Sequence, residues 1–87
     1  MAQAAKINTV LSDGNRLRIL CLLKDGERCV CEIWRHLALP QNLASHHLKV
    51  LSGVGLLRSK KDGLRVFYSL NKPALRRHIT FLNGFLK

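Results

Sequence analysis

Apolar residues in the first half of the chain recur at the three- and four-residue spacing of helices. This pattern predicts a first helix over residues 2–11 and a second over residues 15–24. Ser12 and Asp13, between them, end the first helix and offer an N-cap to the second. Because apolar side chains surround the second helix almost completely, we expect it to lie at the centre of the core.

The same spacing predicts a short helix from Val30 or Cys31 to Leu37 and a longer helix from Pro40 through Leu51. Proline suits the first turn of a helix because its missing N–H would have no partner there. Two helices joined by only a few residues are the components of a helix-turn-helix.

The spacing changes to strand-like alternation over residues 57–70, where Asp62-Gly63 predicts the turn of a β-hairpin. A last helix is predicted over residues 73–86. The order of these elements predicts a mainly α fold with a β-hairpin wing. We therefore expect residues 1–87 to form a single winged helix-turn-helix domain.

The composition agrees with one small globular domain, since 87 residues are too few for a second core. A hydrophobic content of 47% excludes a disordered or collagen-like chain. No apolar run approaches the roughly 18–20 residues that span a bilayer, and the first residues do not resemble a signal peptide. We expect a cytoplasmic protein without a membrane partner.

The formal net charge is +10, and it is unevenly distributed. Residues 1–44 carry six basic and four acidic side chains, whereas residues 45–87 carry nine basic and one acidic. A basic half on a compact domain is typical of a protein that binds a polyanion, and double-stranded DNA is the leading candidate. The alternative is a solvated surface that only aids solubility.

The second helix of a helix-turn-helix enters the major groove with its N-terminal residues on base edges. On this basis Asn42, Ser45 and His46 are expected to contact bases, and Gln41 and Lys49 to contact phosphates or bases. The hairpin adds three phosphate-binding candidates: Lys60, Lys61 and Arg65. His47 lies between apolar positions of the same helix, so we interpret it as a partly buried, hydrogen-bonded histidine.

The first and last helices carry more apolar surface than so small a core can cover. We expect this surface to pair with a second copy of the chain, the alternative being a terminal helix folded wholly onto its own domain. The candidate interface residues are Ile7, Leu11, Leu75, Ile79, Leu82, Phe85 and Leu86. A two-fold dimer would present two recognition helices, and therefore predicts an inverted-repeat operator.

Three cysteines are an odd number, which argues against a disulfide framework and for reduced thiols. Cys29 and Cys31 would point about 200° apart inside a regular helix. They can share a ligand only if Cys29 lies in the extended approach to the helix and Cys31 in its first turn. Soft thiolates prefer soft ions. Cys21 lies in an apolar helix, so we interpret it as core filler, with a role as a third ligand as the alternative.

Five segments together resemble one family. Residues 13–23, 37–51, 55–57 and 61–70 are similar to its second helix, its recognition helix, the exit from that helix and its wing. Residues 27–33, Glu-Arg-Cys-Val-Cys-Glu-Ile, resemble its thiol metal box. The family is the ArsR/SmtB metalloregulators. The resemblance implies a homodimeric prokaryotic repressor that leaves its operator when a metal or metalloid binds.

Two departures from the family pattern limit the choice of ion. Trp34 occupies the position of the third cysteine of arsenic-sensing members, and residues 1–20 hold no cysteine of the kind that Cd sensors add. The terminal-helix zinc site of the family would have only His78 here, so we expect no zinc there and interpret His78 as an interface or surface residue. Two cysteines are also too few for a structural zinc site.

The expected effector is trivalent arsenic or antimony, held by Cys29 and Cys31 with a small thiol or water as the third ligand. Cd or Pb is an alternative effector. A redox- or sulfur-responsive repressor using the same cysteines is a second alternative, and a constitutive DNA-binding protein with incidental cysteines is a third. No enzymatic residue set or small-molecule substrate is expected.

Overall fold

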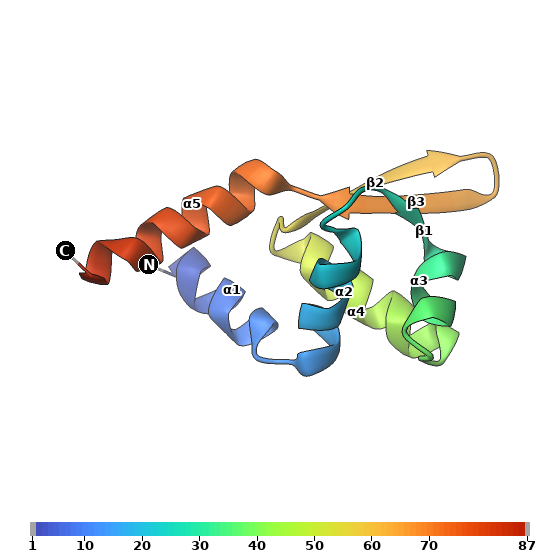
Figure 1. The fold of residues 1–87 in the computed structure, drawn as a ribbon, viewed down its shortest axis with the longest axis horizontal. Coiled ribbons are helices and arrows are strands. Elements are labelled where there is room, and N and C mark those ends of the chain that lie inside the picture. Colours follow the sequence, from blue (N-terminus) through green and yellow to red (C-terminus); the bar gives the residue numbers. More distant parts are fainter. Residues whose placement is uncertain (1, 87) are drawn as a thin grey trace.

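A computed structural model describes residues 2–86. Helices form most of it, and a small antiparallel sheet projects from one end (Figure 1). The elements, in chain order, are α1 (Ala2–Leu11), α2 (Gly14–Leu23), β1 (Arg28–Cys29), α3 (Val30–His36), α4 (Gln41–Gly53), β2 (Leu57–Asp62), β3 (Arg65–Leu70), α5 (Lys72–Asn83) and the 3-10 turn η1 (Gly84–Leu86). The predicted helices are all present, with ends that agree or are shifted by at most three residues.

The Asp13 side chain starts α2. Its Oδ1 accepts hydrogen bonds from the backbone N–H groups of Asn15, at 2.8 Å, and Arg16, at 3.3 Å. The first N–H groups of a helix have no partner within the helix, so this carboxylate stabilises the start of α2. The predicted N-cap is confirmed, and the helix begins at Gly14, one residue before the predicted start.

The side chains of α2 are unequally buried. Ile19 and Leu23 are 0% and 1% exposed, whereas Leu17 is 46% exposed and Cys21 is also exposed. The interpretation of Cys21 as core filler was wrong. Because α2 is apolar almost all round, its sequence did not distinguish the face that packs on α4 from the face left to solvent.

The sheet has three strands in the order β1-β3-β2, all antiparallel. The hairpin was predicted, but β1 was not, since two residues are too few to give a pattern. Cys29 of β1 is paired with Phe67 of β3, and Phe67 is paired on its other side with Lys60 of β2. The hairpin loop is Gly63-Leu64, one residue later than predicted, because Asp62 still pairs with Arg65.

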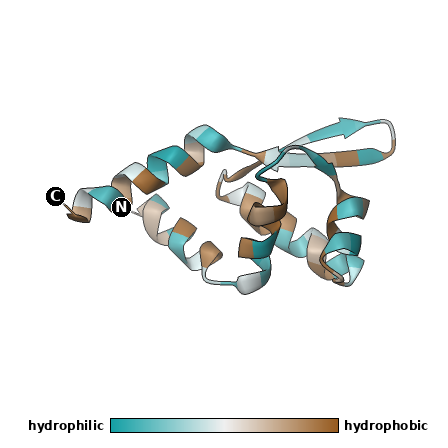
Figure 2. Ribbon diagram, viewed as in Figure 1, coloured by the Kyte–Doolittle hydropathy of each residue, from teal (hydrophilic) through white to brown (hydrophobic). Residues whose placement is uncertain are grey.

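The core lies between the helices and the inner end of the sheet. Six side chains are almost completely buried: Ile19, Leu23, Ile33, Leu48, Leu51 and Leu56. They come from α2, α3, α4 and the segment before β2, so burial of these residues holds the helix-turn-helix to the rest of the domain. Figure 2 shows that β2, by contrast, is largely hydrophilic.

The terminal helices, α1 and α5, pack on each other. His78 of α5 is 6% exposed, and its Nε2 lies 2.8 Å from Oδ1 of Asn8 in α1. The interpretation of His78 as an interface or surface residue was therefore wrong, since it is buried within the protomer. Ile7 is also only 6% exposed, so it belongs to the core and was wrongly placed at the interface.

Other predicted interface residues remain open to a partner. Leu11 and Leu75 are half-buried against the core. Four residues near the C-terminus are exposed, and we call them the terminal apolar patch: Ile79, 55%; Leu82, 40%; Phe85, 71%; and Leu86, 85%.

The molecule is elongated, with principal extents of 45 × 22 × 22 Å. The end of α5 and the β2–β3 hairpin point to opposite ends of the long axis (Figure 1). Within residues 2–86, no helix has the length and hydropathy needed to cross a membrane.

Candidate DNA-binding surface and thiol site

Helix α4 has one buried and one exposed face. Ala44, His47, Leu48 and Leu51 are buried at the spacing of a helical stripe. The opposite face carries the predicted DNA-contacting residues. Gln41, Asn42, His46 and Lys49 are exposed, and Ser45 is half-buried. Core packing therefore orients α4 so that these polar side chains face solvent.

His47 connects α4 to α2. Its side chain is 4% exposed, and its Nδ1 accepts a hydrogen bond of 3.1 Å from Nε of Arg16. Burial lowers the pKa of His47, and the nearby charges of Arg16 and His46 lower it further against the opposing effect of Asp13. The interpretation of His47 as a buried, hydrogen-bonded residue is confirmed.

The turn between α3 and α4 is tight. Ala38 has a φ of +54°, a left-handed conformation that is unfavourable for a residue with a Cβ. Pro40 is the N-cap of α4, one position before the first helical turn where it was predicted. This turn sets the angle at which α4 leaves α3.

The wing carries the basic side chains predicted for it. Lys60, Lys61 and Arg65 are all exposed, on β2 and at the start of β3. The ammonium of Lys60 lies 3.7 Å from a carboxylate oxygen of Glu27, whose segment leads into β1. The wing thus contacts the approach to the thiol site as well as presenting positive charge to solvent.

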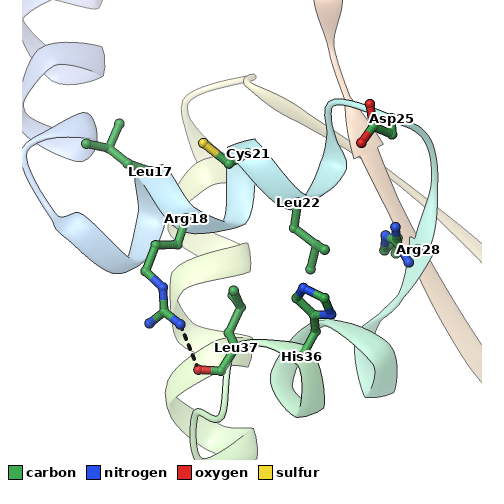
Figure 3. A pocket seen from close by; sticks show the side chains of 8 residues that line it. All are labelled: Leu17, Arg18, Cys21, Leu22, Asp25, Arg28, His36 and Leu37. Atoms are coloured by element: carbon green, nitrogen blue, oxygen red, sulfur yellow. Dashed lines mark hydrogen bonds between the residues drawn. The ribbon is translucent and has the colours of Figure 1, made fainter.

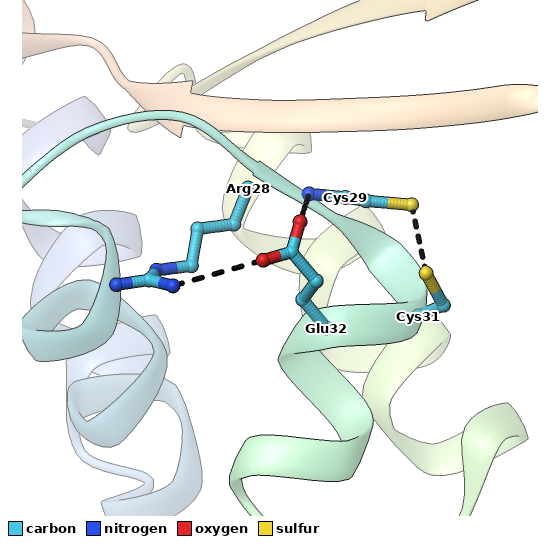
Figure 4. A network of polar contacts seen from close by, with 4 residues as sticks. All are labelled: Arg28, Cys29, Cys31 and Glu32. Carbon is cyan, nitrogen blue, oxygen red and sulfur yellow. Dashed lines mark hydrogen bonds and ion pairs between the residues drawn. The ribbon is translucent and has the colours of Figure 1, made fainter.

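Cys29 and Cys31 are brought together at the start of α3. Cys29 is extended, with φ −68° and ψ 147°, and is 4% exposed, whereas Cys31 lies in the first turn and is half-buried. Their Sγ atoms are 3.0 Å apart (Figure 4). The predicted arrangement of an extended residue followed by a first-turn residue is confirmed. We call these two residues the thiol pair.

The backbone at the thiol pair is held by Glu32. Its Oε1 accepts a hydrogen bond of 3.2 Å from the N–H of Cys29, and its Oε2 lies 3.7 Å from Nη1 of Arg28. Figure 4 shows the Glu32 carboxylate turned toward Arg28 and away from the two sulfur atoms. This carboxylate therefore orients the start of α3.

The two thiols differ in their pKa. The hydrogen bond shared with Cys31 lowers the pKa of Cys29, assisted by the nearby positive charge of Arg65. The same hydrogen bond raises the pKa of Cys31, as does its partial burial. Of the two thiols, Cys29 therefore loses its proton more readily.

The thiol pair opens into a groove shared with α4 and the wing. This groove has a volume of about 400 Å³, and we call it the thiol groove. Its polar lining is Cys29, Cys31, Gln41, Ser45, Lys49, Arg65 and Tyr68. Candidate residues for DNA and for the effector, distant in the sequence, thus line one space.

Cys21 lies elsewhere. It lines a separate groove of about 620 Å³ between α2 and α3, together with Leu17, Arg18 and His36 (Figure 3). Arg18 in this groove donates a hydrogen bond of 3.0 Å to the carbonyl of Leu37. Within residues 2–86, no three His, Cys, Asp or Glu side chains are grouped to hold a metal ion, so Cys21 does not complete the thiol pair.

Two features of the site were not predicted from the sequence. The pairing of Cys29 with Phe67 joins the thiol pair to the wing, and the Arg16–His47 hydrogen bond joins α4 to α2. For the first feature there was one signal in the sequence. The strand predicted over residues 65–70 has two edges, and its hairpin partner pairs with only one of them. No local pattern indicated the second.

Comparison with known proteins agrees with this architecture. A solution NMR structure of a homodimeric winged helix-turn-helix DNA-binding domain from Mycobacterium bovis, a possible ArsR-family transcriptional regulator, matches with a TM-score of 0.81. It is 30% identical, and the match covers 93% of this chain and 76% of that one. The fold is therefore that of a winged helix-turn-helix protein.

Sequence comparisons identify the family. The model for bacterial regulatory proteins of the arsR family matches residues 13–59. An arsenical resistance operon repressor from Staphylococcus aureus is 40% identical over 81 residues, which cover 93% of this chain and 78% of the relative. A cadmium resistance transcriptional regulatory protein, a CadC homolog from Staphylococcus aureus, is 38% identical over 84% of this chain and 61% of the relative. The chain belongs to the arsR family.

Proposed function

We propose that this protein is a homodimeric transcriptional repressor that releases an inverted-repeat operator when a thiophilic metalloid binds Cys29 and Cys31. Its family and its relatives named as resistance repressors support this proposal. The observation that carries it is the thiol groove, because the thiol pair and the exposed face of α4 line the same space. Since DNA is the proposed partner, we place the protein in the prokaryotic cytoplasm.

DNA binding is assigned to α4 and the wing. Asn42, Ser45 and His46 would contact base edges, because they lie in the first half of α4 on or beside its exposed face. Gln41 and Lys49, both exposed on α4, would contact phosphates or bases. Phosphate contacts, which carry little sequence information of their own, are assigned to the exposed wing cations Lys60, Lys61 and Arg65.

Self-association is assigned to the terminal apolar patch. Its four side chains are 40–85% exposed, an arrangement that is costly in water for a chain of this size. Pairing two such patches about a two-fold axis would cover them. The resulting dimer would place two copies of α4 in successive major grooves, about 34–36 Å apart.

The thiol pair fits a soft ion. Two thiolates at about 2.3 Å from a common ion lie roughly 3–4 Å apart, close to the 3.0 Å separation of the sulfur atoms here. Soft thiolates favour trivalent arsenic or antimony, Cd and Pb over hard cations. Among these we favour trivalent arsenic or antimony, because residues 2–86 offer no group of three or more donor side chains for an ion of higher coordination number.

The coupling to DNA follows from where the two sulfur atoms are attached. Cys29 is paired with Phe67 of the wing, and Cys31 lies in the first turn of α3, which packs on α4. Moving both sulfur atoms toward a shared ion would therefore shift the wing and α3 relative to α4. We expect a coupling free energy of about 1–3 kcal/mol, the usual range for allosteric coupling between two sites.

The test is fluorescence anisotropy on a labelled duplex selected from a random library by the reduced protein. We expect arsenite to weaken binding about 5–150-fold, the range that corresponds to this coupling. The Cys29→Ser/Cys31→Ser variant should bind the duplex normally and not respond. Cys21→Ser is the matched control, since it removes an exposed thiol outside the thiol groove and should respond as the wild type.

Other outcomes separate the remaining hypotheses. A response to Cd or Pb without one to arsenite or antimonite would transfer the effector role to those ions. Release on mild oxidation alone, reversed by a reductant, would favour the redox hypothesis. If the double variant keeps the full response, or the wild type shows none to any of these treatments, the thiol pair does not regulate DNA binding.

A further inference from the structure

The thiol groove has a chemical character that the effector ion alone does not use. Lys49 and Arg65 line it, together with the polar side chains Gln41 and Ser45, and its lining contains no carboxylate. The carboxylate drawn in Figure 4, that of Glu32, is engaged with Arg28 and the N–H of Cys29. Two cations therefore border the thiol pair without an acidic partner in the groove.

The groove is also much larger than one ion requires. Its volume is about 400 Å³, whereas a water molecule in the liquid occupies about 30 Å³. A volume of this order lies within the range of pockets that hold small organic ligands, roughly 300–1,000 Å³. A ligand substituent of several non-hydrogen atoms can therefore fit beside the sulfur atoms.

Trivalent arsenic forms three bonds, and the thiol pair supplies two of them. Within residues 2–86, the nearest further thiol, that of Cys21, lies in the other groove, and no set of three donor side chains is present. The third ligand must then come from solution. A sulfur donor is preferred over water, because soft ions prefer soft ligands.

We propose that the thiol groove binds the third ligand of the effector, and that this ligand is a low-molecular-weight thiol carrying a carboxylate. The inference rests on the proposed function and goes beyond it by assigning Lys49 and Arg65 to the effector. The carboxylate would accept charge-assisted hydrogen bonds from Arg65 and Lys49. Gln41 and Ser45 add neutral donors on the α4 side of the groove.

The chemistry is balanced without a redox partner. Arsenite, As(OH)₃, exchanges its three hydroxyl groups for three sulfur atoms, two from the thiol pair and one from the small thiol. The three thiol protons leave with the hydroxyl groups as three molecules of water. Arsenic remains trivalent throughout, so no oxidant or reductant is required.

This assignment gives the two cations a second role. Lys49 and Arg65 are also proposed to contact DNA, and each can satisfy only one anionic partner well at a time. The carboxylate of the bound thiol would therefore compete directly with DNA for these side chains. Release of DNA would depend on the charge of the small thiol as well as on arsenite.

The test uses three small thiols of different charge: 3-mercaptopropionate, 2-mercaptoethanol and cysteamine. The full chain, reduced by a phosphine, is titrated with arsenite in the presence of each thiol. Arsenic–thiolate absorbance is followed without DNA, and anisotropy is followed with DNA. We expect half-saturation at an arsenite concentration at least ~10-fold lower with 3-mercaptopropionate than with cysteamine. Native mass spectrometry should show one arsenic and one mercaptopropionate per protomer.

Variants separate the groove from the intrinsic affinity of each thiol for arsenic. The preference for the anionic thiol is the ratio of the half-saturating arsenite concentrations measured with cysteamine and with 3-mercaptopropionate. Arg65→Gln and Lys49→Gln should each reduce this preference at least ~3-fold. Comparing the preference of each variant with that of the wild type cancels the intrinsic affinity of each thiol for arsenic. Lys61→Gln is the matched control, because it removes a wing cation that does not line the groove, and it should keep the wild-type preference.

The failures are distinguishable. If DNA is released equally with all three thiols, or if the preference is the same in wild type and Arg65→Gln, the inference is overturned and the proposed function stands. If no arsenic–thiolate absorbance develops with any thiol, both are overturned.

Discussion

At the scale of single residues, His47 shows how burial sets the protonation of a side chain on α4. The Nδ1 of His47 accepts from Arg16, so this nitrogen must carry a free lone pair in the native state. A proton there would remove the acceptor and place a positive charge beside the guanidinium. Burial and this neighbour both lower the pKa of His47 from its usual value near 6.5.

The sign of the pH dependence follows from that direction. The unfolded chain binds a proton at His47 more readily than the folded chain, so the free energy of unfolding falls as the pH is lowered below about 6.5. His47→Gln should reduce the loss of stability between pH 7.5 and pH 5. Urea denaturation at both pH values, at one protomer concentration, measures it.

The matched control for His47 is its exposed neighbour. His46→Gln should retain most of the wild-type pH dependence, because His46 is exposed and has the smallest of the effects that lower the pKa of His47. An equal change in both variants would contradict the role of the buried hydrogen bond.

At the scale of elements, the turn between α3 and α4 stores strain at Ala38. Holding a non-glycine residue in the left-handed region destabilises the folded state by about 1–3 kcal/mol. Substitution by glycine removes this strain, but it also raises the entropy of the unfolded chain, which offsets part of the gain in stability. Ala38→Gly should therefore raise the free energy of unfolding by up to about 1 kcal/mol. Thermal and urea denaturation at fixed protomer concentration test this.

An alanine within α4 provides the comparison for that turn. Ala44 is fully buried in regular helix, so Ala44→Gly should destabilise by about 1 kcal/mol or more. Two substitutions of the same kind are thus expected to have opposite signs. A destabilising Ala38→Gly would mean that the turn is not strained in solution.

The wing is the element whose charge should control salt dependence. Removing the cation that neutralises one phosphate reduces the slope of log K against log salt by about 0.9, and a dimer has two wings. Lys61→Gln should therefore lower the slope by about 2 while weakening all duplexes alike. The measurement is anisotropy between 50 and 300 mM salt, roughly the range in which such contacts dominate.

Lys6→Gln is the matched control for the wing. Lys6 is an exposed cation on α1, at the other end of the molecule (Figure 1), and its removal should leave the slope unchanged. A slope that does not change in Lys61→Gln would remove the wing from the DNA interface.

At the scale of the whole molecule, the terminal apolar patch decides the oligomeric state. Phe85 is 71% exposed, so Phe85→Glu costs the protomer core little. We expect this variant to be a monomer by light scattering. Its operator affinity should fall at least ~100-fold, because the two recognition helices would no longer be linked.

An exposed leucine outside the patch controls for surface charge. Leu64 is fully exposed at the tip of the wing, and Leu64→Glu should remain a dimer. Dimeric Phe85→Glu would place the interface on another surface.

The amino-acid sequence by itself determined the helices and the hairpin, and it supplied the candidate site residues. Some features depend only on neighbouring residues and can be predicted from the local sequence: the helix cap at Asp13, the tight turn at Gly63 and the helical spacing along α4. The same is true of the thiol pair, whose approach depends only on where α3 begins.

Only the tertiary structure decided which surfaces meet. Packing on α4 selected Ile19 and Leu23 for the core and left Cys21 in solvent, although all three lie on one apolar helix. Strand pairing brought Cys29 beside the wing, and with it Arg65 into the thiol groove. These outcomes depend on contacts between residues far apart in the chain. Which face of an element is buried depends on the free energy of the whole fold, and it therefore leaves no local pattern in the sequence.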